Sequence, residues 1–95
     1  MSVTAIVLMK AKTTQINELA QAIVAIPGVR DVYSVAGRVD LVAVVHAHKN
    51  EDLADLISGK IHGVPGLESS ETFIAFRTYC SADVDAGFSL GNPES

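Results

Sequence analysis

The 95-residue sequence has no tryptophan, one cysteine and only seven lysine or arginine residues. A lone Cys80 excludes an internal disulfide framework and fits a reducing compartment. The basic residues are scattered and the net charge is −4, whereas nucleic-acid binders present a basic stripe to the phosphates. No apolar run approaches the roughly 20 residues of a membrane helix, and no signal-peptide pattern is present. We therefore expect a cytoplasmic chain with neither nucleic acid nor membrane as a direct partner.

What the chain does contain is apolar residues: 48% are hydrophobic and only 19% are charged. A chain of this length forms one domain and buries only about two-thirds of the surface that its unfolded form exposes. Such a composition in so small a domain favours a homodimer or a larger assembly.

The first half of the chain reads as a strand, a helix and a hairpin. Residues 3–9 form a β-rich run, and Thr13 or Thr14 offers a hydroxyl to cap the next helix. Apolar residues then recur at helical spacing until Pro27-Gly28. A strand over residues 29–36 leads through a Gly37-Arg38 turn into a second strand over residues 41–47, with Gly37 supplying a positive φ.

The second half reads as a helix and a strand. Asn50 is the expected N-cap of a helix that ends at residues 63–66, and Gly59 weakens its second half. The last strand is expected over residues 67–79. We assign residues 1–80 to the domain and residues 81–95 to a short C-terminal turn, capped by Ser81, and a frayed tail.

The order β-α-β-β-α-β predicts an α+β, ferredoxin-like fold with a four-stranded antiparallel sheet. Pro27-Gly28-Val29 and Pro65-Gly66-Leu67 occur 38 residues apart, as expected for two related halves. In that topology the first and third strands are central, and both helices cover one face of the sheet.

The two central strands have large apolar residues on both faces, because side chains alternate along a strand. The face away from the helices carries one of two sets: Ile6, Leu8, Val42 and Val44, or Val3, Val7, Leu41 and Val45. Leaving four such side chains in water forgoes roughly 6–12 kcal/mol, which is comparable to the stability of a small domain. A dimer in which the two sheets pack against each other removes these side chains from water. The alternative is a monomer with some exposed Val and Ala residues, which are common on protein surfaces.

The residues that could do chemistry give little support for an enzyme. His46 and His48 lie two apart at a strand's end, and no spacing links them to His62 or Cys80 as metal ligands. Cys80 has no identifiable base to activate it. The sequence therefore predicts no metal, no cofactor and no catalytic residue.

The turn at residues 36–40 is the more informative segment. Its glycine exposes backbone N–H groups, and Arg38 and Asp40 offer opposite charges, which match the carboxylate and ammonium of an amino acid. An ordinary hairpin whose Asp40 caps its own turn is the alternative.

Three segments together resemble a known family: Pro27-Gly28-Val29, residues 33–41 (YSVAGRVDL), and Val64-Pro65-Gly66-Leu67 leading into Ser70-Glu71-Thr72. They are similar to the effector domain of leucine-responsive and asparagine-responsive transcription regulators, the regulation of amino acid metabolism (RAM) domain. Full-length members carry an N-terminal helix-turn-helix, so this chain, whose first strand begins at Val3, is expected to be a stand-alone version.

The resemblance implies sheet-to-sheet dimers, rings of dimers, and amino-acid effectors bound between dimers. Carried over by position, the implied ligand-binding residues are Tyr33, Gly37, Arg38, Asp40, Ser70 and Thr72. The expected function is non-enzymatic sensing, with output to a partner such as a full-length regulator of the same family. Two alternatives remain open: a small dimeric α+β-barrel enzyme of the cofactor-free monooxygenase or isomerase type, favoured by a cavity lined by His46, and a purely structural assembly module.

Overall fold

The computed structural model describes residues 2–79. Its elements, in chain order, are β1 (Val3–Ala11), a 3₁₀ turn (Thr13–Gln15), α1 (Ile16–Val24), β2 (Val29–Ser34), β3 (Leu41–Ala47), α2 (Asn50–Ala54), a π-helical continuation of α2 (Asp55–Ile61), and β4 (Leu67–Ile74). Cys80 and the turn and tail predicted over residues 81–95 lie outside the described residues.

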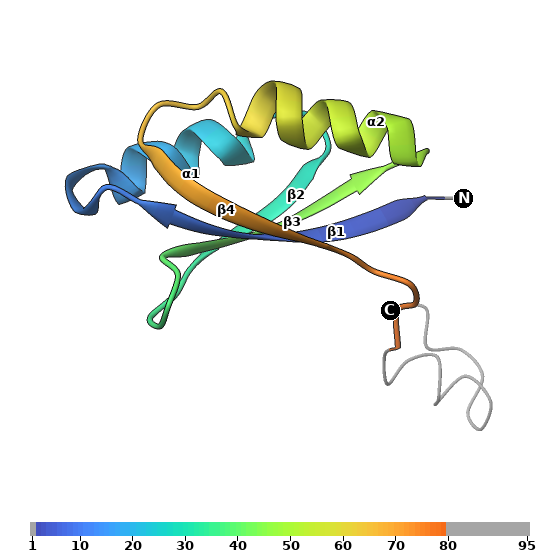
Figure 1. Ribbon diagram of the computed structural model, residues 1–95, viewed down its shortest axis with the longest axis horizontal. Coiled ribbons are helices and arrows are strands. Elements are labelled where there is room, and N and C mark those ends of the chain that lie inside the picture. Colours follow the sequence, from blue (N-terminus) through green and yellow to red (C-terminus); the bar gives the residue numbers. More distant parts are fainter. Residues whose placement is uncertain (1, 80–95) are drawn as a thin grey trace.

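The four strands form one antiparallel sheet in the order β2-β3-β1-β4. Both helices lie on the same face of this sheet, and the other face carries no helix from the described part of the chain (Figure 1). The ferredoxin-like α+β fold is therefore confirmed, with β1 and β3 at the centre. No helix within residues 2–79 is long and apolar enough to cross a membrane.

The core lies between the helices and the sheet and is entirely apolar. Its fully buried side chains alternate along β1 and β3, as Ala5, Val7 and Met9 show, and meet Leu19 and Ile23 of α1. In the described part of the chain no polar or charged residue is buried. The space between helices and sheet is thus filled by well-packed hydrocarbon.

The helix starts differ from expectation. Thr13 and Thr14 lie inside the 3₁₀ turn and make no capping hydrogen bond, and α1 begins at Ile16. The backbone closes this turn itself, because the Gln15 N–H donates to the Lys12 carbonyl at 2.8 Å. Asn50 is the first residue of α2 and not its cap.

The second half of the long helix is wider than an α-helix. The His62 N–H donates to the carbonyl of Ile57, five residues back, at 3.0 Å, which is the π-helical pattern. This geometry keeps Leu56, Ile57 and Ile61 on the buried side.

Strand β4 is shorter than expected, because its pairing with β1 ends near Thr4. Ile74 pairs with Ala5 of β1, and the Ala75 N–H makes a last bond to the Thr4 carbonyl at 2.9 Å. Beyond that point Phe76 is fully exposed. The strand predicted over residues 67–79 therefore ends early, at Ile74.

The face of the sheet without helices, called here the open face, carries the first of the two apolar sets. Ile6 is 38% exposed, and Leu8, Val42 and Val44 are half-buried. The register adds Tyr33 of β2 opposite Val42 and Phe73 of β4 opposite Ile6. The expectation of a large apolar surface is confirmed, although neighbouring side chains shield part of each residue.

The turn between α1 and β2 gives a test of the packing. Gly28 has a φ of 102°, and a Cβ there would lie 2.9 Å from Leu56 Cδ2 and 3.2 Å from the His46 carbonyl oxygen. We expect Gly28→Ala to lower the free energy of unfolding by about 1–3 kcal/mol, measured by urea denaturation. Gly59→Ala is the control, since nothing lies within 4 Å of its Cβ position and alanine favours helices. Equal stability of the Gly28 variant and the parent would contradict this packing.

Candidate functional site

The candidate site begins at the turn between β2 and β3. The Val35 N–H donates to the Asp40 carbonyl at 3.0 Å, and the Asp40 N–H donates to the Met9 carbonyl at 2.9 Å. Between these bonds Gly37 lies at an exposed position, with a φ of 155° and no atom within 4 Å of a Cβ. The turn is therefore closed at its base and open at its tip.

The Asp40 side chain ties this turn to β1. The last pair between β1 and β3 is Met9 with Leu41, so the Ala11 N–H lies beyond the end of the ladder. Asp40 Oδ2 accepts that N–H at 2.9 Å, because a backbone donor without a strand partner needs another acceptor. One carboxylate oxygen of Asp40 thus holds the protein's own backbone.

This tie places the turn across the end of β1 and close to β4. The turn, β1 and β4 surround an open depression of about 450 Å³, which is lined by Leu8, Lys10, Arg38, Val39, Ser69, Ser70 and Glu71. The lining contains two cations, one carboxylate and the hydroxyl of Ser69. Such a depression can bind a small molecule that carries charges of both signs.

The structure brings together some of the expected site residues. Arg38 and Ser70 line the depression, and Gly37 and Asp40 belong to the adjoining turn. Ser70 Oγ also lies 2.8 Å from His62 Nε2.

The other two expected residues lie elsewhere in the single chain. Tyr33 is on β2, at the opposite edge of the sheet from β4, and is 53% exposed. Thr72 pairs with the buried Val7 and lines a separate groove of about 400 Å³ between α2 and β4. Neither residue reaches the depression within one protomer.

Sequence reasoning missed Lys10 and Glu71. Alternation along β1 places Lys10 on the same face as Leu8, and this signal was readable. The position of Glu71 depends on its pairing with Leu8, and no local pattern fixes that register.

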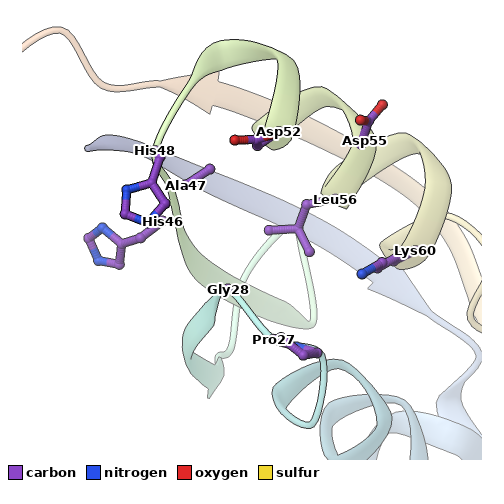
Figure 2. A pocket seen from close by; sticks show the side chains of 9 residues that line it. All are labelled: Pro27, Gly28, His46, Ala47, His48, Asp52, Asp55, Leu56 and Lys60. Carbon is purple, nitrogen blue, oxygen red and sulfur yellow. The ribbon is translucent and has the colours of Figure 1, made fainter. Parts of the chain in front are cut away.

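A second depression, of about 500 Å³, lies at the other end of β3 and contains His46, His48, Asp52 and Lys60. Figure 2 shows the two histidines at the end of β3, and the helix that carries Asp52 and Lys60 across from them. His46 Nδ1 lies 3.0 Å from Thr4 Oγ1. Across residues 2–79, no three His, Cys, Asp or Glu side chains are arranged to hold a metal.

This His46 depression bears on the enzyme alternative. It is an open hollow at the surface, and not a chamber between sheet and helices, because the core there is filled by apolar side chains such as Val45 and Leu53. Enzymes of the α+β-barrel type place their polar catalytic group in a deep pocket. Within residues 2–79 the filled interior offers no such pocket.

Comparison with known proteins agrees with the fold. The sequence pattern of the Lrp/AsnC ligand binding domain matches residues 4–84. The chain therefore belongs to the Lrp/AsnC ligand-binding-domain family.

Three relatives illustrate the range of similarity. The crystal structure of TTHA0845 from Thermus thermophilus superposes with a TM-score of 0.77 at 40% identity, over 82% of this chain and 98% of that one. The HTH-type transcriptional regulator FL11 from Pyrococcus horikoshii is 28% identical over 78 residues, which are 82% of this chain and 51% of the regulator. A feast or famine regulatory protein of M. tuberculosis, complexed with L-methionine, shares the fold with a TM-score of 0.70 at 23% identity, over 82% of this chain and 52% of that one.

The curated regulators and TTHA0845 differ in how much of their length this chain covers. The chain spans about half the length of the curated regulators that it matches, and nearly all of TTHA0845.

The tie between Asp40 and β1 can be tested by substitution. We expect Asp40→Ala to lower the free energy of unfolding by about 1–3 kcal/mol, because the Ala11 N–H loses a charged acceptor, and to speed hydrogen exchange of that amide. Asp40→Asn keeps a side-chain oxygen and should recover most of the loss, and the exposed Asp55→Ala controls for the loss of one negative charge. Unchanged exchange at Ala11 in Asp40→Ala would show that the carboxylate does not hold this turn.

Proposed function

We propose that this chain is a non-enzymatic, cytoplasmic module that senses an amino acid and changes its assembly in response. The observation that carries the proposal is the depression at the β2–β3 turn, lined by side chains of both charges, in a member of a ligand-binding family. An amino acid at neutral pH carries an ammonium and a carboxylate, and the depression offers partners for both.

Two further observations support a regulatory role. The curated relatives are HTH-type transcriptional regulators, and a regulatory protein with the same fold was solved with L-methionine bound. The filled core leaves no deep interior pocket for catalysis within the described residues.

The open face supports assembly through a second copy of the chain. Ile6, Tyr33 and Phe73 are 38%, 53% and 48% exposed, and Thr4 and His46 add a polar border. Covering each exposed aromatic or aliphatic side chain contributes about 1–2 kcal/mol. Because a two-fold interface is self-complementary, the sheet of one copy packed on the sheet of another removes this surface from water in both.

The depression lies where it can influence that assembly. Leu8 and Lys10 belong to both the open face and the depression, so a bound ligand lies at the border of the interface. A ligand that binds one assembly state more tightly than another shifts the population toward that state. We propose rings of dimers as the responding assemblies, and mixed assembly with a full-length regulator of the same family as the output.

The sensing proposal is tested by calorimetric titration with the twenty amino acids. Ser69 lines the depression, and we expect Ser69→Tyr to fill it and weaken binding of the best ligand by at least about tenfold. Ser34→Tyr is the matched control, because Ser34 is an exposed residue of β2 that lies at the other edge of the sheet. If no amino acid gives heat with the parent chain, the sensing role is wrong and a structural assembly module remains.

The assembly proposal is tested by a charge on the open face. We expect Ile6→Lys to raise the dimer dissociation constant at least about 100-fold by sedimentation equilibrium, because two ammonium groups would be buried against apolar side chains. Val24→Lys is the control, since Val24 is 47% exposed on α1, and it should leave the mass unchanged. Circular dichroism confirms that both variants fold. Equal dimerisation of the Ile6 and Val24 variants would rule out the open face as the interface.

A further inference from the structure

The charged side chains that line the depression at the β2–β3 turn have a net charge, and the sign of that charge indicates which amino acids fit. Lys10 comes from β1, Arg38 from the turn and Glu71 from β4. Resting on the proposed function, we propose that the effector is an acidic amino acid, glutamate or aspartate, and not a neutral aliphatic one.

All three charged groups of the lining are available to a ligand. Within residues 2–79 the only ion pair joins Arg30 and Asp31, so none of the three has an opposite charge within ion-pair distance in that part of the chain. Lys10 Nζ makes only a long contact of 3.5 Å to the Arg38 carbonyl oxygen. That contact leaves the Arg38 guanidinium unoccupied and places the Lys10 ammonium against the same turn.

The charge of the lining complements that of an acidic amino acid. Two cations and one carboxylate give the lining a charge of +1, and glutamate or aspartate carries two carboxylates and one ammonium. Each group of such a ligand finds one partner of opposite sign: the carboxylates take Arg38 and Lys10, and the ammonium takes Glu71. A guanidinium binds a carboxylate through two parallel hydrogen bonds, which adds selectivity for a planar anion.

The neighbouring acidic groups do not line the depression. Asp40 Oδ2 is held by the Ala11 N–H at 2.9 Å. Glu68 lines an adjoining hollow with His62, Leu67, Ser69 and Ser70, and is not among the residues that line the depression. The charged groups that a ligand contacts in the depression are therefore Lys10, Arg38 and Glu71.

The lining also discriminates between ligand side chains. Leu8 and Val39 are the large apolar residues there, and Ser69 supplies a hydroxyl. A leucine or methionine side chain would leave one of the two cations without a partner, whereas a second carboxylate gains that cation. Charge complementarity of this kind discriminates strongly between ligands. A charged group that loses water and finds no partner in the site weakens binding, because its desolvation is not compensated.

The test is calorimetric titration of the whole chain with glutamate and aspartate, each compared with its amide, glutamine or asparagine, and with leucine and methionine. We expect one acidic amino acid to bind at least about tenfold more tightly than its amide, the loss expected for one charge-assisted pair. Arg38→Gln and Lys10→Gln should remove most of this preference. Lys12→Gln should keep it, because Lys12 is exposed but does not line the depression.

The outcomes separate this inference from the proposed function. Tight binding of a neutral amino acid, with the acid no better than its amide, would overturn the acidic preference and leave amino-acid sensing intact. An acidic preference that survives in both Arg38→Gln and Lys10→Gln would place the site elsewhere and overturn the assignment of these residues. Binding of none of the six amino acids in the parent chain would overturn the inference; heat from another of the twenty would still support sensing.

Discussion

The structure depends on one constraint: β1 and β3 alternate large apolar side chains between two faces, and the helices cover only one face. Val7, Met9 and Leu41 are fully buried beneath α1 and α2, while Ile6 and its neighbours remain on the open face. The described residues provide no further layer to cover that surface, and a small domain has little stability to spare for leaving it in water. The proposed assembly with a second copy thus rests on the alternation of the two central strands, and the depression shares Leu8 and Lys10 with the same face.

A second, local constraint positions the site. Strand β1 continues past its last pair with β3, and the exposed Ala11 N–H takes the carboxylate of Asp40. This bond holds the β2–β3 turn across the end of β1, next to Ser69, Ser70 and Glu71 of β4. Segments far apart in the chain therefore form one depression. Asp40 acts on the proposed site by holding the turn, while Arg38 lines the depression.

Much of the fold was readable from the sequence, because the alternation of apolar residues and the Pro-Gly turns specify the β-α-β-β-α-β order. The sequence did not show which of the two apolar sets lies on the open face, because that depends on the side of the sheet on which the helices pack. Thr13 and Asn50 were plausible helix caps by residue type, but neither side chain makes a capping hydrogen bond. A backbone hydrogen bond closes the turn before α1, and Asn50 is the first residue of α2. Glu71 was missed, and the separation of Tyr33 from the depression within one protomer was not foreseen, for one reason: strand register and order are tertiary properties.

The measurement that tests the central claim most directly is the mass of the unmodified chain in solution, followed by light scattering from nanomolar to high micromolar concentration. We predict an even multiple of the chain mass at micromolar concentration, with tyrosine fluorescence from Tyr33 changing as the sheets meet. A folded single copy at every concentration would contradict this, because the apolar side of the sheet would then be stable in water.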